Sequence, residues 1–328
     1  FFETGIFKGL LTSNSVNNSV PKSFPGHSLT EFRNDYAFAA IKSDGSVVAW
    51  GDKSAGGDYS DVVSGLSNVS TIYSNSKAYA AVISDGSVVS WGHETYGGNS
   101  SGVELKLNGN IKVSEISSTK SAFAALREDG SVVTWGSSSN GGEIGQAAQA
   151  KLDKSNVEKI YSNISAFAAI TDSGSVITWG YDDSGGDSSI VSSELKDIVD
   201  IYSTGSAFAA LREDGSLITW GNPNDGGVSI HLKEELDGST DIVQIASTTA
   251  AFALLKADGS VVAWGDINNG GNISSVENDL SGSIKVVSIY STDSAFAALR
   301  SDGSVITWGN PSKGGNSSIV SMSLNGQN

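Results

Sequence analysis

The sequence lacks cysteine altogether and has only four prolines and one methionine among its 328 residues. The absence of cysteine excludes disulfides, thiol nucleophiles and thiolate metal ligands. Basic residues are also few, since 20 Lys and Arg stand against 36 Asp and Glu, which gives a formal net charge of −16. Because that charge repels phosphate backbones and anionic lipids, we expect no nucleic-acid partner and no attraction to a membrane surface.

Long apolar runs are missing as well. No stretch approaches the ~18 apolar residues of a membrane helix, so we expect no direct membrane insertion. The chain opens with FFETGIFKGLL, without an initiator Met or a basic segment before an apolar one, which predicts a fragment or a processed form. An acidic, cysteine-free chain rich in Gly, Ser, Asn and Asp is typical of large bacterial surface proteins. We therefore expect an extracellular or cell-surface location, with a cytoplasmic one left open.

The residue patterns of common catalytic sites are also absent. The only histidines, His27, His93 and His231, stand in unrelated contexts, and neither H-E-x-x-H nor G-x-S-x-G occurs. Adjacent carboxylates such as Asp182 and Asp183 usually point apart on a turn. The sequence therefore predicts that the protein is not an enzyme.

A repeated phrase dominates what is present. Its Asp-Gly or Ser-Gly corner recurs at intervals of 41, 44, 44, 41, 44 and 44 residues, near residues 44, 85, 129, 173, 214, 258 and 302. Seven copies at this period are typical of propeller blades and of helical arrays. The runs around each corner are β-branched and aromatic, and no amphipathic helix recurs, so the local pattern favours strands.

The corner predicts a β-hairpin with Asp129-Gly130 as a two-residue loop. In that register Phe123 would face Gly136 and Ala124 would face Trp135, so that each large residue meets a small one. Apolar residues lie on both faces of the hairpin, which predicts a sheet packed between two neighbours.

Further strands are expected around each hairpin. A third strand is predicted before it, at residues 69–74, 113–118, 157–162, 198–203, 242–247 and 286–291, with 28–32 as its nearest equivalent in the first copy. A fourth is predicted in the variable stretch that follows, for example 188–195. The predicted fold is an all-β, single seven-bladed β-propeller with mainly antiparallel, about four-stranded blades. Residues 1–34 would form a closing segment, and 35–328 the propeller, with the ring closed by the N- and C-terminal segments.

The frame AFAALREDGSVVTWGSSSNGG (122–142) resembles the repeats of the regulator-of-chromosome-condensation family, also called alpha-tubulin-suppressor-like repeats, in the bacterial surface-protein type. Seven such frames cover roughly residues 35 to 316. The resemblance implies a seven-bladed β-propeller that binds proteins; its members include an exchange factor for a GTPase and a β-lactamase inhibitor. Here Ala122 and its equivalents replace the family's usual His, and a bare Gly pair replaces G-Q-L-G, which argues against exchange activity.

The loops after each Trp-Gly vary most, and variable loops on a rigid frame are where recognition usually occurs. The competing interpretation is that they are ordinary turns in which Gly pairs serve tight bends. The binding candidates that we select in these loops are Tyr59, Tyr96, Tyr181, Asp182, Asp183, Asn222 and Asn268. The seven Trp are assigned to packing.

Calcium is a weaker hypothesis, because the loops offer oxygen ligands but none matches the twelve-residue calcium template. The carboxylates concerned are Asp52, Asp58, Asp183, Asp187 and Asp266. No other cofactor or metal is expected.

The sequence thus predicts a non-catalytic binding or display module of an extracellular bacterial or phage-associated surface protein, which recognises a protein or glycan through loops on one rim. One alternative is a structural building block of a filament or adhesin, assembled into a larger surface structure. Another is a soluble protein inhibitor or GTPase-regulator-like propeller.

Overall fold

The computed structural model describes residues 32–326, and all of its sheets are antiparallel. The six third strands predicted between residues 69 and 291 all form, so that six sheets have three strands in chain order. The first sheet has two strands, β1 (Ala37–Ile41) and β2 (Val47–Gly51). The others are β3 (Val69–Ser74), β4 (Ala78–Ile83) and β5 (Val88–Gly92); β6 (Val113–Ser118), β7 (Ala122–Arg127) and β8 (Val132–Gly136); β9 (Val157–Ser162), β10 (Ala166–Thr171) and β11 (Val176–Gly180); β12 (Ile198–Ser203), β13 (Ala207–Arg212) and β14 (Leu217–Gly221); β15 (Ile242–Ser247), β16 (Ala251–Lys256) and β17 (Val261–Gly265); and β18 (Val286–Ser291), β19 (Ala295–Arg300) and β20 (Val305–Gly309).

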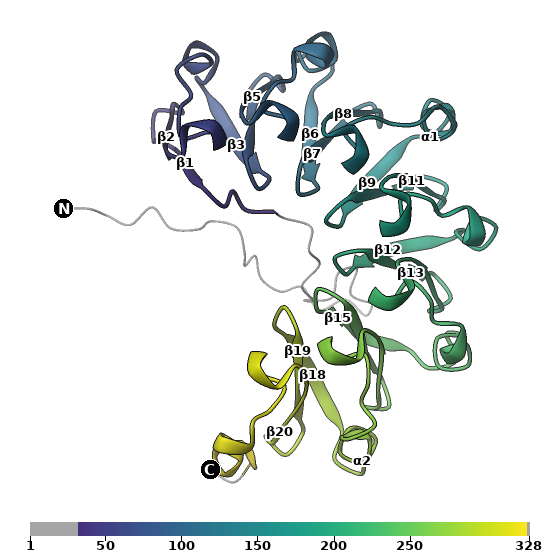
Figure 1. The fold of residues 1–328 in the computed structure, drawn as a ribbon. Helices are drawn as coiled ribbons and strands as arrows, with labels where there is room; N and C mark the ends of the chain where they lie inside the picture. The colour runs from purple at the N-terminus through teal and green to yellow at the C-terminus, as the bar shows by residue number, and fades with distance from the viewer. Residues whose placement is uncertain (1–31, 327–328) are drawn as a thin grey trace.

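Each sheet therefore has three strands, or two in the first, rather than the expected four. The stretches expected to supply a fourth strand form short helical turns instead: η2 (Val63–Gly65), η4 (Ser101–Lys106), α1 (Gln146–Leu152), η7 (Ser189–Val191), η9 (Ile230–Leu232), α2 (Glu277–Leu280) and η12 (Ser318–Leu324). We call these the outer turns, since α1 and α2 lie at the outer edge of the molecule (Figure 1). No helix among residues 32–326 is long and apolar enough to cross a membrane.

The predicted hairpin register is wrong by one residue. Phe123 pairs with Trp135 and Ala122 pairs with Gly136, and the same holds in all seven hairpins. The reason is a three-residue loop: the Gly130 N–H donates to the Arg127 carbonyl at 2.9 Å, and the Arg127 N–H donates to the Ser131 carbonyl at 3.0 Å. Gly130 has a φ of 76°, as expected for the left-handed residue that follows a type I turn.

The corrected register places two rings on one face of each hairpin. Phe123 stacks on Trp135 with 5.3 Å between ring centroids, and the other six hairpins have the same pair with Tyr79 in place of one Phe. The opposite face carries Ala and branched residues. The predicted sheet with two apolar faces is confirmed, and its pattern is a large face and a small face rather than large–small pairs across strands.

The core is divided among six clusters, one between each two successive sheets. In one of them the small face of the second sheet, with Ala78 and Ala80, packs against Phe123 and Trp135 of the third. Figure 1 shows the seven sheets side by side along an arc, with an opening between β1–β2 and β18–β20. The described residues thus form an open arc. The predicted closing strand 28–32 and segment 1–34 lie almost wholly outside the described residues.

Candidate functional site

The first half of each internal glycine-pair loop lies between two neighbouring sheets rather than on an exposed rim of the propeller. After Gly180 the chain makes one 3-10 turn, η6 (Asp182–Ser184), and then reaches Gly185, which has a φ of 93°. A Cβ at Gly185 would lie 2.7 Å from the Phe208 ring of the next sheet. The Gly185 carbonyl accepts a 3.0 Å hydrogen bond from Trp220 Nε1. This first half of the loop is therefore a contact between sheets, as the ordinary-turn interpretation implies.

The predicted tyrosines differ in exposure. Tyr181 is 50% exposed and directly precedes η6. Tyr59 is half-buried and packs against the cluster between the first two sheets. Tyr96 is half-buried, lies edge-on to His93 at 5.0 Å between ring centroids, and has Lys77 Nζ 5.3 Å from its ring centre. Tyr181 has the largest free surface of the three.

The predicted polar residues mostly shape their own turns. Asn222 accepts a 2.9 Å hydrogen bond from the Asn224 N–H, and the Asn268 N–H donates to Asp266 at 2.9 Å. Asp182 and Asp183 are exposed in the first turn of η6. The structure spreads these candidates over separate loops.

The calcium candidates behave in the same way. Asp52 accepts hydrogen bonds from the Ser54 N–H at 2.8 Å and hydroxyl at 2.6 Å, and these bonds lower the pKa of its carboxyl. Asp58 accepts from the Ser60 N–H at 3.1 Å, Asp187 from the Ser189 N–H at 2.8 Å, and Asp266 also from Asn269 Nδ2 at 2.7 Å; Asp183 is exposed. Within residues 32–326 no three His, Cys, Asp or Glu side chains gather in a way that could hold a metal ion.

One recess brings predicted and unpredicted residues together. It has a volume of about 480 Å³ and lies between α1 and the loop after β11. Asp182 and Asp187 line it on one side, and Glu143, Gln146 and Lys151 line it from α1 and the loop before it. Sequence reasoning missed α1, although its Ala- and Gln-rich stretch QAAQAKL has high helix propensity.

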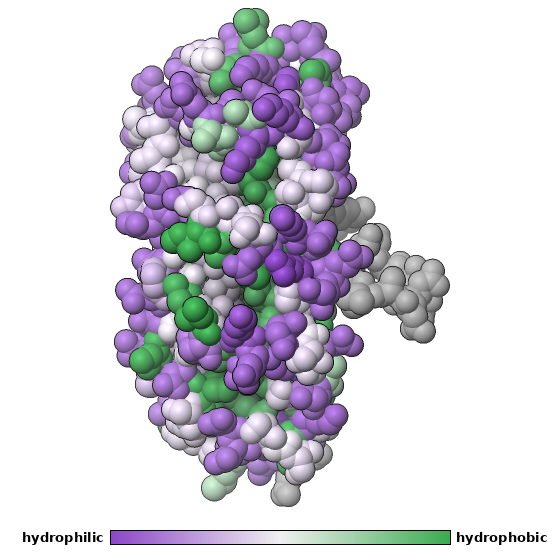
Figure 2. All heavy atoms as spheres, turned by 90° about the vertical axis from the view of Figure 1, so that its right-hand side faces the viewer, coloured by the Kyte–Doolittle hydropathy of each residue, from purple (hydrophilic) through white to green (hydrophobic). Residues whose placement is uncertain are grey.

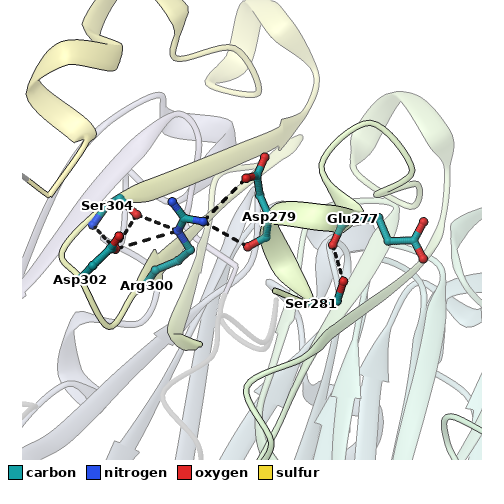
Figure 3. A network of polar contacts seen from close by, with 6 residues as sticks. All are labelled: Glu277, Asp279, Ser281, Arg300, Asp302 and Ser304. Atoms are coloured by element: carbon teal, nitrogen blue, oxygen red, sulfur yellow. Dashed lines mark hydrogen bonds and ion pairs between the residues drawn. The ribbon is translucent and has the colours of Figure 1, made fainter. Parts of the chain in front are cut away.

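The outer turns carry many exposed residues, and buried leucines anchor them. Each of the first six ends on a buried leucine or one to four residues before it; these leucines are Leu66, Leu107, Leu152, Leu195, Leu236 and Leu280. The hairpin corner provides a second anchor: Arg300 Nε donates to the Ser304 hydroxyl at 2.7 Å, and its Nη1 lies 3.7 Å from an Asp279 carboxylate oxygen in α2 (Figure 3). Arg212 contacts the Glu194 carbonyl beside η7 in a similar way.

Beyond these anchors the outer turns present apolar side chains to solvent, which sequence reasoning also missed. Figure 2, which views the outer edge of the arc, shows apolar patches separated by polar side chains. The most exposed aliphatic side chains in the outer turns are Ile190 (95%), Ile319 (94%), Met322 (89%), Leu105 (86%) and Ile230 (80%). Ile190 and Ile319 occupy the same place in their repeats, five residues after the first Gly of the pair, as do Leu105 and Met322, eight residues after it.

Seven antiparallel sheets packed face to face around a common centre define a seven-bladed β-propeller fold. Solved structures that are similar to this chain include two from yeast and a plant. Prp20p from Saccharomyces cerevisiae, described with its binding properties to Gsp1p and histones, is 17% identical over 85% of this chain and 82% of that one, with a TM-score of 0.46. The CRINKLY WD40 ectodomain of the Arabidopsis thaliana receptor kinase ACR4 is 15% identical over 85% and 93%, with a TM-score of 0.43. No protein-family model and no curated protein sequence matches the chain.

Proposed function

We propose that this protein is a non-catalytic binding propeller that recognises a protein partner through its outer turns. The observation that carries the proposal is the set of almost fully exposed aliphatic side chains held on anchored turns at the outer edge. Single exposed apolar residues are common on protein surfaces, but here Ile190 and Ile319 share one repeat position and Leu105 and Met322 share another. A partner that covers them would remove apolar area from water at little cost in loop ordering.

The chemistry of the exposed groups favours a protein over a glycan. Glycan sites use exposed aromatic faces, whereas six of the seven indoles are buried between sheets, from Trp91 to Trp308. Aliphatic side chains between Ser, Asp and Glu suit the apolar centre and polar rim of a protein interface. The loop carboxylates and amides mostly cap their own turns, which supports a scaffold rather than a catalytic role.

We also propose that the protein acts outside the cell or at its surface. The net charge of −16, the absence of cysteine and the Gly- and Ser-rich composition support this location. Protease treatment of intact cells that produce the protein tests it. Degradation of the protein without lysis is expected, and survival of the protein until lysis would contradict the proposal.

The binding proposal is tested with the variant Leu105→Ser, Ile190→Ser, Ile230→Ser, Ile319→Ser. Since all four side chains are at least 80% exposed, we expect the free energy of unfolding to change by less than about 0.5 kcal/mol for each. A partner recovered on the wild-type protein and then purified should bind the variant at least tenfold more weakly in calorimetry, by the loss of about 1.4 kcal/mol.

The matched control replaces four exposed serines of the same outer edge, Ser64, Ser101, Ser189 and Ser318, with alanine. This control should bind as the wild type does. Equal affinity of the aliphatic variant and the wild type would refute recognition through the outer turns.

A further inference from the structure

The first sheet leaves its large face uncovered. Phe38 is 65% exposed and Trp50 is 53% exposed, although their rings stack at 5.4 Å like those of every other hairpin. In the other six sheets the equivalent aromatic residues are at most 5% exposed. The first sheet thus presents, in water, a surface that the fold buries everywhere else.

The last sheet leaves the complementary small face uncovered. Gly314 is exposed, whereas the six equivalent glycines, from Gly56 to Gly270, are buried. A Cβ at Gly270 would lie 2.6 Å from the Phe296 ring, but a Cβ at Gly314 would meet only the Thr292 methyl carbon at 3.9 Å. Tyr290 on the same sheet is 61% exposed, against 6% for the equivalent Tyr202.

Within residues 32–326, the two uncovered faces also carry hydrogen-bonding groups without the partner that their internal equivalents have. Six indole N–H groups donate to the carbonyl of a glycine in the preceding sheet's loop, at 3.0 to 3.2 Å. Within residues 32–326, Trp50 and the Gly314 carbonyl make no such bond.

A series of backbone hydrogen bonds that links each sheet to the next also stops at the first and the last sheet. The Asp35 N–H donates to the Ser76 carbonyl at 3.1 Å, and the series continues from turn to turn until the Thr249 N–H donates to the Asp293 carbonyl at 2.9 Å. Among the described residues, the Asp35 carbonyl and the Asp293 N–H have no partner in this series. Each end of the arc is therefore one half of the interface that the chain builds six times.

We propose that the opening between β1–β2 and β18–β20 binds one β-sheet segment of a partner polypeptide. The opening is bordered by the uncovered large face of β1–β2 and the uncovered small face of β18–β20 (Figure 1), so one inserted sheet, which has a face of each kind, completes both half-interfaces. Its aromatic face, with an indole N–H for the Gly314 carbonyl, lies on β18–β20. Its opposite face, of Ala and branched residues with a free glycine carbonyl, covers Phe38 and Trp50.

The two-sided shape of the site selects this occupant over a second copy of the protein. A second copy has one uncovered face on its first sheet and one on its last, so each of its sheets can cover only one end of the opening. A lone sheet has both faces free and covers both ends. This surface is separate from the outer turns, and its test is independent of the proposed function.

The test uses the full chain and a labelled synthetic peptide of residues 198–227, which contains the three strands of one internal sheet and its glycine-pair loop. Fluorescence anisotropy should show saturable binding. The variant Phe38→Ser, Trp50→Ser should bind the peptide at least tenfold more weakly, and a peptide with Phe208→Ser should lose affinity similarly. The control Ile190→Ser, Ile230→Ser, which removes two apolar side chains that are more exposed than Phe38 and Trp50 and lie elsewhere on the surface, should bind the peptide as the wild type does.

A fusion protein tests the same contact without requiring the free peptide to fold on its own. Residues 198–227 appended after Asn328 through a Gly/Ser linker should raise the Tm of the chain, and Phe38→Ser, Trp50→Ser should abolish the increase. Equal peptide affinity of wild type and this variant, or no binding together with an unchanged Tm of the fusion, would overturn the proposal. Self-association of the chain that the same variant abolishes would assign the surface to a second copy and overturn it too.

Discussion

The smallest contact that joins two sheets is a glycine packed against an aromatic ring of the next sheet. Gly185 has a φ of 93°, a conformation costly for any other residue, and a side chain there would overlap the Phe208 ring. This double requirement explains why the first glycine of the pair recurs while the residues around it vary.

The first prediction concerns that glycine. Gly185→Ala should lower the free energy of unfolding by about 2–4 kcal/mol, because left-handed strain and overpacking add. The matched control is Gly102→Ala, where a Cβ would meet nothing within 4 Å. Urea unfolding should show less than about 0.5 kcal/mol of change for the control. Equal effects of the two substitutions would show that the glycine pair is not a packing contact.

The second prediction concerns the indole N–H. Trp220→Phe removes the donor to the buried Gly185 carbonyl and leaves a gap beside Phe208, so we expect a loss of about 1–3 kcal/mol. Trp50→Phe is the matched control, because Trp50 is 53% exposed. Thermal unfolding should separate the two variants clearly, and a similar Tm for both would contradict the assigned role of the buried indoles.

At the scale of the element, the hairpin corner shows where sequence reasoning succeeds and where it fails. The Asp-Gly or Ser-Gly pair correctly located each reversal, because glycine adopts a positive φ far more readily than other residues. The pair could not distinguish a two-residue from a three-residue loop, since both use glycine in that conformation. At the third corner Asp129 accepts the Ser131 N–H at 3.0 Å and stabilises the type I turn, but the fourth corner forms the same three-residue loop with Ser173 in the place of the aspartate. Because the observed register differs from the predicted one by one residue, each aromatic residue lies opposite the Trp and stacks on it, instead of facing a small residue.

The outer turns and α1 were missed for a related reason. A short apolar stretch with one buried leucine is compatible with a strand or a helical turn. Tertiary contacts decide between them, such as those of Arg212 and Arg300 at the corner of the following hairpin with the loops of η7 and α2. The binding candidates in the loops were selected by chemical type. The structure shows that most of the selected carboxylates and amides cap their own turns. Tyr181, Asp182 and Asp183 remain exposed, and their binding role stays a prediction.

The corner also predicts a pH dependence. Hydrogen bonds from Ser216 and Ser260, two residues further on, lower the pKa of Asp214 and Asp258 from the ordinary value of 3.8. Because the folded-state pKa is the lower one, these groups contribute stability above the unfolded-state pKa, and that contribution is lost as the pH falls through the folded-state value. Unfolding by urea should therefore become easier below about pH 4.

A natural comparison is the fourth corner, where Ser173 replaces the aspartate. The variant Asp258→Ser should thus show a smaller loss of stability between pH 5 and pH 3 than the wild type does. An unchanged loss would mean that other carboxylates cause the acid sensitivity. Neighbouring Lys256 also lowers the pKa of Asp258, so added salt should reduce part of the effect.

At the scale of the whole molecule, the period of the repeat together with the β-branched and aromatic runs around each corner was enough to predict a propeller with seven blades. The number of strands in each blade was not predictable in the same way, because it depends on the tertiary contacts that make the stretch after each Trp-Gly a short helical turn. Closure of the ring by the terminal segments stays a prediction, since residues 1–31 lie outside the described part of the chain. How far the described sheets extend around the ring depends on the angle that each interface imposes between neighbouring sheets. In the described structure this angle leaves an opening, and the two faces that border it are halves of one recurring interface.

The measurement that tests this account most directly uses the absence of cysteine. The variant Ala40→Cys, Ala297→Cys places one thiol on each end face, at positions whose internal equivalents, such as Ala80 and Ala125, share a core cluster. An open arc predicts that, under mild oxidation at low protein concentration, both thiols stay free and titratable in the monomer. Complete formation of an intramolecular disulfide would show that the first and last sheets pack against each other, and would contradict the open arc.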